Sequence, residues 1–500
     1  MRFVLVPIVI LFWSISPAQA EDITEKDLLE HIDILASDAF GGRKPGTTGE
    51  NKTVNYIATS WAKAGLTPGV DNKNWYMPVT LVERTPLTQD IRFSRAAGNK
   101  RKNISIGDDQ IVLRGAEKDI RFEQVELVHA GYGLGDPESL RARVSGKMAF
   151  LYLSGRPAVP DFPSYQKRKK NLLAAGARGV IAIVKGEARW SRFARRYKRT
   201  GTNLDQAGLH AEIEGLISAK AIRKIMRKAG LDADMIAAGS AEKDYLPAIM
   251  NAAVTLSVNT RVHKFKSHNV IGKIAGKEPK SGVLLFLGHW DHFGTCLPKT
   301  AEDRICNGAV DNASGISLLI ETAERLALAK LDRDIYFLAT TAEESGLLGA
   351  RAFASDPAFP LDRLVVAFNA DSVALTPDGK KIAVIGLGQT ALDPQIEKVA
   401  EMQGREIDMS GKPDVFLARQ DGYVFTDKGY PAFMITSAFA DEERLNAFLA
   451  GRYHDVSDES DSGLELGGAR DDANFHVALG QYFGSLATYP KKPTSGATQN

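Results

Sequence analysis

Histidines and carboxylates with the spacing of metal ligands follow several apolar runs in the carboxyl-terminal half of the sequence. His289 and Asp291 end one such run, and Asp311 stands before a segment with helical spacing. The adjacent acids Glu343 and Glu344 follow another run. Neighbouring acids repel each other, so they are a poor choice for stability alone. They make sense if one carboxylate binds a cation while the other handles a proton.

Two further residues extend this set. Asp371 follows a third apolar run, and His454 lies in a predicted loop far downstream. A lone histidine is usually packed or exposed, and an acid before a helix is usually a cap. Two imidazoles and three carboxylates together suit a pair of Zn²⁺ ions that share one carboxylate. The predicted ligands are His289, Asp311, Glu344, Asp371 and His454.

The elements that must position these residues alternate between strands and helices. Strands are expected over residues 283–287, 334–339, 364–367, 381–385 and 432–436, and helices over 313–329, 346–354, 392–402, 442–449 and 473–486. This alternation is typical of a mixed, mostly parallel sheet sandwiched by helices, an α/β fold. Open α/β folds bind ligands at the carboxyl ends of their strands, where the candidate ligands stand.

The length of 500 residues predicts two or three domains. A content of 44% hydrophobic and 25% charged residues is that of a globular protein, and a net charge of +2 selects no partner. Short strand-like runs around a helix make residues 119–245 a separate small α/β module. The expected boundaries are 21–118 and 246–490 for the two parts of a catalytic domain, 119–245 for the insert, and 491–500 for a disordered tail.

Residues 1–20 have the pattern of a cleaved secretory signal. Arg2 precedes an apolar run over residues 3–15, and Ala18-Gln19-Ala20 follows as a cleavage site. Cleavage after Ala20 would make the protein periplasmic or secreted, without stable membrane insertion. An uncleaved membrane anchor stays open as the alternative, although the run is short for a bilayer span of ~20 residues.

Two further features lie outside the ligand set. Cys296 and Cys306 would pair in an oxidising compartment, which predicts a disulfide beside the site, with two free thiols or a metal pair as the alternative. Residues 161–200 hold twelve Lys and Arg against two Asp and Glu. This basic patch could attract an acidic surface or substrate, or be a solvated face. Nucleic acid is not expected as a partner of an exported protein.

The motifs resemble those of the co-catalytic di-zinc aminopeptidase family, which also contains glutamate carboxypeptidase. Residues 37–46 look like the amino-terminal segment of that family, and residues 119–245 resemble its protease-associated domain insert. The motifs are His289-x-Asp291, Asp311 within Val-Asp-Asn-Ala-Ser-Gly, Glu343-Glu344, Asn369-Ala370-Asp371 and Tyr453-His454.

The resemblance implies two Zn²⁺ per subunit and assigns a place to each ligand. Asp311 would bridge the two metals. His289 and Asp371 would complete one site, and Glu344 and His454 the other.

The resemblance also assigns three supporting features. Asp291 would orient the His289 ring and raise its basicity. Glu343 would be the general base that takes a proton from a metal-bridging water and passes it to the departing amine. A cis peptide bond is expected between Asp311 and Asn312.

The chain departs from the family at one segment. Residues 419–425 resemble a segment that commonly reads Ser-Asp-His or Ser-Asp-Tyr, but Gly422 takes the place of the aromatic residue. In relatives that side chain helps to stabilise the tetrahedral intermediate, and here Tyr423 could substitute. An equally open alternative is that Tyr423 only packs. His292 is expected to support the site or pack in its loop, because both metals already have ligands.

These features predict an exported di-zinc metallo-exopeptidase acting on peptides, with an aminopeptidase as the leading interpretation. A carboxypeptidase of the same fold is the closest alternative, because relatives use the same metal site on the other end of a peptide. A glutaminyl cyclase is less favoured because a cyclase of this fold needs only one zinc. An inactive peptide-binding module would be expected to lose ligands, and none is lost. The sequence defines neither the preferred residue nor the oligomeric state.

Overall fold

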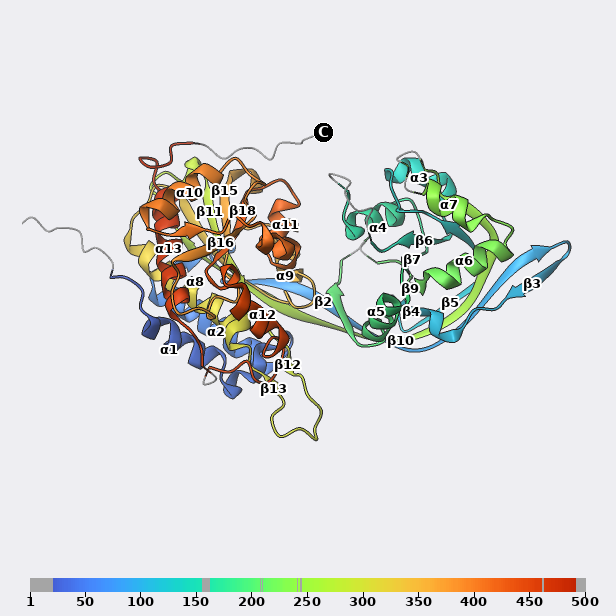
Figure 1. Ribbon diagram of the computed structural model, residues 1–500, viewed down its shortest axis with the longest axis horizontal. Helices are drawn as coiled ribbons and strands as arrows, with labels where there is room; N and C mark the ends of the chain where they lie inside the picture. The colour runs from blue at the N-terminus through green and yellow to red at the C-terminus, as the bar shows by residue number, and fades with distance from the viewer. Residues whose placement is uncertain are drawn as a thin grey trace, which may run out of the picture. The chain divides into compact units, whose positions relative to one another are not determined.

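The computed structural model describes residues 21–154, 162–206, 208, 210–240, 242, 245–460 and 463–491. The predicted signal segment lies outside these residues, as does the predicted tail beyond Lys491. The chain divides into two compact units (Figure 1). Unit 1 comprises residues up to Met77 and from His268 onward, and unit 2 comprises Pro78–Ser267. Unit 2 contains residues 119–245, whose assignment as a protease-associated domain stays a prediction.

Unit 1 is built on a mixed sheet with the strand order β17-β16-β18-β15-β11-β14-β10. Its central strands β18, β15, β11 and β14 are parallel, whereas β16 pairs with β18, and β10 with β14, in the antiparallel sense. This confirms the predicted fold class. The strands are β10 (Ala248–Ile274), β11 (Val283–His289), β14 (Asp334–Thr340), β15 (Leu364–Asn369), β16 (Lys381–Ile385), β17 (Glu406–Ile407) and β18 (Ala432–Thr436).

Helices cover both faces of this sheet because its central strands are apolar on both sides. In β11, Leu284 and Phe286 belong to one core, and Leu285 and Leu287 belong to the other. The first core is closed by α1 (Glu25–Leu35), α2 (Thr48–Lys63), α8 (Gly315–Leu328), α10 (Asp393–Met402) and α13 (Gly467–Gly484). The second is closed by α9 (Leu348–Ser355) and α11 (Tyr423–Thr426).

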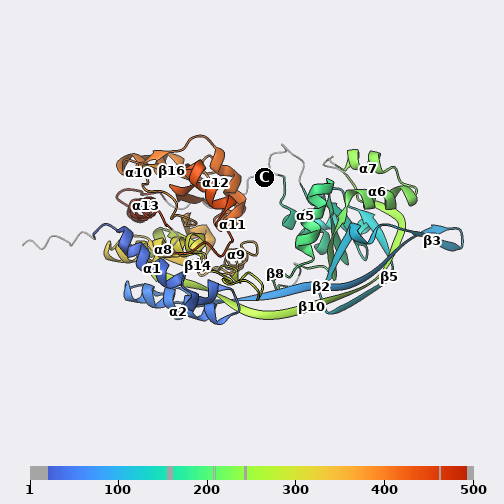
Figure 2. The same ribbon diagram turned by 60° about the horizontal axis from the view of Figure 1, so that its bottom comes forward.

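All five predicted strands and all five predicted helices of this region are present, with ends that shift by a few residues. The helix expected over residues 473–486 begins earlier, at Gly467. β2 (Tyr76–Ala97) and the long strand β10 were not predicted, and the boundary between the two units crosses both strands. β2 and β10 pair with each other (Figure 2).

Unit 2 has its own sheet, in which β5 (Asp119–His129), β6 (Met148–Tyr152), β7 (Gly179–Val184) and β9 (Ile213–Ser218) are parallel. The strand β4 (Ile111–Gly115) pairs with β9 in the antiparallel sense. Helices α5 (Glu187–Tyr197) and α6 (Ala219–Lys228) pack on opposite faces (Figure 2).

Two residues of the predicted basic patch, Arg168 and Lys169, are buried and form contacts within the protein. Arg168 is buried and donates to the backbone carbonyls of Tyr132 and Tyr152, and buried Lys169 pairs with Glu214 at 3.1 Å. The arginines of α5 are exposed, which agrees with a solvated face. Among the described residues, no helix combines the length and apolar character needed to cross a membrane.

Candidate metal centre

The parallel register of three strands brings the candidate ligands to one edge of the sheet. His289 at the end of β11 pairs with Thr340 at the end of β14, and Leu287 pairs with Asn369 at the end of β15. The chain leaves β14 toward Glu343 and Glu344, and it leaves β15 toward Asp371. These carboxylates therefore meet His289 at the carboxyl ends of the strands, as predicted.

Asp311 lies in a distorted turn before α8 that is fixed from both sides. The predicted cis peptide bond between Asp311 and Asn312 is present. The Asn312 amide donates to the carbonyl of Ala370 at 3.0 Å and accepts from Gly315 N–H at 2.9 Å. The buried carboxylate of Asp458 accepts from the N–H of Asp311 at 3.1 Å. Asp458, which the sequence did not single out, thus positions the residue predicted to bridge two metals.

The two carboxylate oxygens of Asp311 face two different groups of side chains. Oδ1 lies 3.3 Å from Nε2 of His289, which is itself 3.7 Å from Oδ1 of Asp371. Oδ2 lies 3.3 Å from Nε2 of His454, which is 3.1 Å from Oε2 of Glu344. The structure therefore brings all five predicted ligands together, and it divides them as expected for two cations that share Asp311.

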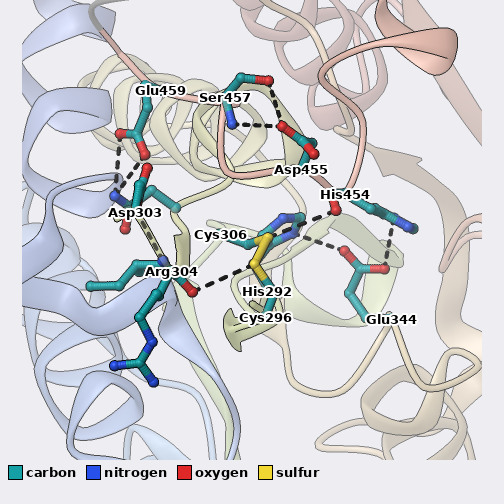
Figure 3. Close-up of a disulfide and its surroundings, with 12 residues drawn as sticks. His292, Cys296, Asp303, Arg304, Cys306, Glu344, His454, Asp455, Ser457 and Glu459 are labelled. Carbon is teal, nitrogen blue, oxygen red and sulfur yellow. Dashed lines mark hydrogen bonds and ion pairs between the residues drawn. A yellow bond between two sulfur atoms is a disulfide. The ribbon is translucent and has the colours of Figure 1, made fainter. Parts of the chain in front are cut away.

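His292 joins the second group. Its Nδ1 lies 2.9 Å from Oε1 of Glu344 (Figure 3), and His292, Asp311 and Glu344 offer donor atoms within 4.8 Å of one another. Nε2 of His292 is buried without a hydrogen bond to any described residue. The second site thus has one more imidazole than the sequence predicted.

The electrostatics of the site favour bound cations. Burial lowers the pKa of His454, but hydrogen bonds to Asp311 and Glu344 outweigh burial and raise that pKa to about 9. The pKa of buried His289 is likewise well above its ordinary value, because nearby carboxylates, first Glu343, outweigh burial. Protons on these rings compensate the carboxylates, which is the role that metal ions would take over.

Asp291 is placed to support both His289 and Glu343. Its backbone carbonyl accepts from Nδ1–H of His289 at 3.1 Å, which leaves Nε2 free to bind a metal. Its carboxylate accepts from the N–H of Glu343 at 2.9 Å and lies 3.9 Å from the imidazole. The Asp291 carboxylate therefore restrains the backbone of Glu343 more directly than it restrains the imidazole ring of His289. Burial raises the pKa of Asp291 to about 7.

Glu343 lines a cavity together with His289, Asp311 and Asp371. Burial raises the pKa of Glu343 well above its ordinary value, and the carboxylates of Asp421 and Glu344 add to this rise. Such a shift suits a group that must hold a proton it has taken.

Tyr423 does not take the missing aromatic position. It is absent from the described cavity wall, and its hydroxyl donates to Asp427 at 3.3 Å, which favours the packing alternative. Tyr453 lines the cavity instead, and its ring stacks on His454 with 3.6 Å between centroids. Burial raises the pKa of Tyr453, so its hydroxyl stays protonated.

The space beside Gly422 is filled by Gln420. A Cβ atom at Gly422 would come within 2.7 Å of the Gln420 side-chain oxygen, which accepts from the Gly422 N–H. Gln420 is buried and lines the cavity. The Gln420 side chain therefore occupies space that a side chain at position 422 would need.

The opposite wall of the cavity is apolar. It is formed by η6 (Lys412–Arg419), β18, η7 (Ala438–Ala440) and α12 (Glu442–Ala450). An apolar wall beside a charged centre suits a ligand with a hydrophobic group next to a polar one. The wall consists of Phe416, Met434, Phe439, Leu445, Phe448 and Leu449.

Arg43, at the end of η1 (Asp38–Arg43), connects the amino-terminal segment to the site. Its buried guanidinium donates to the carbonyl of Trp290 at 2.9 Å, to that of Leu35 at 2.8 Å and to that of Gly308 at 2.8 Å, and it also bonds the carbonyl of Asn307. Trp290 follows His289, and Gly308 precedes the Asp311 turn. The segment is thus part of the support of the site.

The predicted disulfide between Cys296 and Cys306 is present, with 5.8 Å between the Cα atoms. It joins β12 (Gly294–Thr295) to β13 (Ile305–Cys306), and Sγ of Cys306 lies 3.7 Å from the carbonyl of His454 (Figure 3). The bridge therefore ties the loop after His292 to the segment before Asp311, and its Cys306 sulfur touches the backbone of His454.

Comparisons with known proteins agree with this geometry. Residues 269–474 match the sequence model of Peptidase family M28. The chain is 25% identical to "probable leucine aminopeptidase 2" of Aspergillus oryzae over 92% of this chain and 80% of that protein. It is 26% identical to "Aminopeptidase YwaD" of Bacillus subtilis over 67% of this chain and 59% of that protein. It spans only 10% of the length of a "Vacuolar membrane protease" of Lachancea thermotolerans, to which it is 34% identical.

The fold resembles that of a solved "Aminopeptidase from Aneurinibacillus sp. strain AM-1", with a TM-score of 0.51 and 18% identity over 96% of this chain and 97% of that one. This likeness shows a shared α/β fold. The chain carries a Peptidase family M28 domain, which extends over residues 269–474.

Proposed function

We propose that the protein is a zinc-dependent aminopeptidase, which removes amino-terminal residues from peptides. The observation that carries this proposal is the orientation of Asp311, whose two oxygens face separate groups of ligands while Glu343 lines the same cavity. Imidazole and carboxylate donors in this number suit zinc. His289, Asp311 and Asp371 would hold one ion, and Asp311, Glu344 and His454 the other.

The reaction would divide between the ions and the side chains. Two bound zinc ions would supply an acidified water molecule and polarise the scissile carbonyl. Glu343 would accept the proton of the attacking water on a carboxylate oxygen and donate it to the departing amine. The protonated hydroxyl of Tyr453 would donate a hydrogen bond to the carbonyl oxygen as negative charge develops there. Asp291 would hold Glu343 and His289 in place through the contacts described above.

Two features of the cavity support action at the amino terminus. The proposed zinc ions would neutralise Asp311 and Asp371, so Glu343 is the acid of the described cavity wall that is left to attract a free α-ammonium group. The apolar wall beside them would receive the side chain of the first residue. Export of the enzyme remains part of the proposal and rests on the sequence of residues 1–20.

A carboxypeptidase is the second candidate, and one observation favours it. Arg419 lines the same cavity, and a guanidinium is the usual partner of a carboxylate. A carboxypeptidase would use it to recognise the end of a peptide.

The test is a panel of peptides with free or acetylated amino termini and with carboxylate or amide carboxyl termini. An aminopeptidase cleaves every peptide with a free amino terminus and spares the acetylated ones. Cleavage of acetylated peptides that depends on a free carboxylate would contradict the proposal. Loss of cleavage on chelation, and its recovery with zinc, would test the metal requirement.

A further inference from the structure

Arg419, the last residue of η6, is the one lysine or arginine among the described residues that line the cavity. The other charged side chains there are His289 and the acids Asp311, Glu343 and Asp371. This guanidinium borders an acidic site and faces the space that a substrate would occupy, so it can contact a bound substrate.

Most N–H donors of the Arg419 guanidinium have no acceptor among the described residues. Arg419 forms no ion pair with any carboxylate in the part of the chain that the structure describes, and its side chain is exposed. Its Nη2 lies 3.5 Å from the hydroxyl of Tyr453, and its Cζ lies 5.1 Å above the ring of Phe416. Five N–H donors therefore share one protein acceptor. The two aromatic rings restrain the side chain, which lowers the entropy lost when a ligand binds.

Tyr453 relates Arg419 to the reacting bond. The Tyr453 ring stacks on His454, whose Nε2 reaches Asp311 and Glu344. A group held by Arg419 would thus lie next to the place where the scissile carbonyl is expected. In a dipeptide the terminal carboxylate is only one residue, ~3.8 Å between Cα atoms, beyond that bond.

We propose that Arg419 binds the free carboxylate of the residue that follows the scissile bond, so that the enzyme prefers dipeptides and other very short peptides. This inference rests on the proposed aminopeptidase function. The apolar wall would select the first side chain, and the acidic side would bind the amino group. Arg419 would favour short peptides, because only their terminal carboxylate lies close enough to reach it. A bidentate bond to the carboxylate would use donors that are free in the protein.

The test compares Leu-Ala, Leu-Ala-amide and acetyl-Leu-Ala as substrates of the zinc-loaded full chain. We expect KM for Leu-Ala-amide to exceed KM for Leu-Ala by about tenfold, as for a partly exposed charge-assisted contact. In Arg419→Met, KM for Leu-Ala should rise to the value for the amide, so that the variant no longer prefers the free carboxylate. Arg419→Lys should restore part of the difference, because an ammonium keeps the charge without the planar fork.

A binding measurement removes the dependence on turnover. Calorimetry on the Glu343→Gln variant should give a dissociation constant for Leu-Ala about tenfold below that for Leu-Ala-amide, and the added substitution Arg419→Met should equalise them. Arg444→Met is the matched control. Arg444 is an exposed arginine of α12 that pairs with Asp441 and Glu465 and does not line the cavity. Its substitution should change neither constant.

Two outcomes would overturn the carboxylate role. One is equal KM of the wild type for Leu-Ala and its amide. The other is an equal fall of kcat on both substrates in Arg419→Met with the KM difference retained, which would show that Arg419 acts only on the Tyr453 hydroxyl. Cleavage of acetyl-Leu-Ala but not of Leu-Ala-amide would overturn the aminopeptidase proposal and leave the carboxylate role standing.

Discussion

At the scale of residues, the centre is organised around Asp311 and the groups that hold it. Its turn is bonded by Asp458 on one side and, through Asn312, by Ala370 on the other. Bridging requires both carboxylate oxygens to point in fixed directions, and these contacts provide that restraint. His289, Glu344 and Asp371 could be proposed as ligands from the sequence because they follow strands, whereas Asp311 and His454 stand in a turn and a loop and were proposed from their residue types and the family motifs.

Tyr453 and Tyr423 make a matched pair for a kinetic test. Tyr453→Phe should lower kcat by at least about tenfold, or ~1.4 kcal/mol, because it removes the hydroxyl beside the scissile carbonyl. Tyr423→Phe should leave kcat unchanged, because that hydroxyl contacts Asp427 outside the cavity wall. Steady-state kinetics on a leucyl substrate measure both. A slow Tyr423→Phe enzyme with a normal Tyr453→Phe enzyme would reverse the assignment.

The sequence pointed to Tyr423 and not to Tyr453 for a physical reason. Tyr423 is next to Gly422 in the chain, whereas only the cavity and the stack on His454 show which hydroxyl faces the site. The approach of His292 to Glu344 and the filling of the space beside Gly422 by Gln420 are also tertiary contacts. Residue spacing along the chain carries no signal for them.

At the scale of elements, the amino-terminal segment takes part in the site through Arg43. Its η1 turn has positive φ at Gly41, Gly42 and Arg43, and a Cβ at Gly42 would collide with the carbonyl of Cys306. The close approach lets the arginine reach the carbonyls around His289 and Asp311. The sequence identified the segment only by its resemblance to the family, because a lone arginine in a turn has no visible partner.

Replacement of Arg43 should weaken this region strongly. Arg43→Met leaves buried carbonyls without donors, so we expect a loss of about 3 kcal/mol or more in the free energy of unfolding. Lys26→Met in α1 is the control, because its exposed pair with Glu30 at 3.7 Å should contribute less than about 1 kcal/mol. Denaturant unfolding followed by tryptophan fluorescence measures both. Equal stabilities of the two variants would contradict a supporting role of Arg43.

The burial pattern of each strand decided whether it was predicted from the sequence. The central strands of unit 1 are buried on both faces, so they appear as continuous apolar runs bounded by turns. β2 and β10 alternate between buried and exposed positions and include charged residues such as Lys264 and Lys266. Their length comes from pairing with different strands at their two ends, which local patterns do not report.

At the scale of the whole molecule, both units contain a histidine that is buried in its neutral form. Burial lowers the pKa of His476 in unit 1 and of His129 in unit 2 to about 4. Nδ1–H of His476 donates to the carbonyl of Asp472 at 2.7 Å, and its Nε2 has no partner among the described residues. A proton on that nitrogen would be buried without an acceptor.

Acid should therefore destabilise both units. Between pH 6.5 and 4 the unfolded chain binds a proton at each histidine that the folded chain does not, so stability is lost as the pH falls, on the order of 3 kcal/mol for each histidine. Thermal unfolding over this range should show a shallower pH dependence in His476→Gln and His129→Gln than in the wild type. An unchanged pH dependence in both variants would contradict this account.

The central claim is that the site binds two zinc ions and that Glu343 transfers the proton. The most direct measurement combines metal content and turnover in Glu343→Gln. We predict two equivalents of zinc, as in the wild type, and cleavage of amino-terminally free peptides at least about a thousandfold slower, because the ligands remain and only the base is lost. Wild-type rates in this variant would contradict the account, and so would a wild type that binds no zinc.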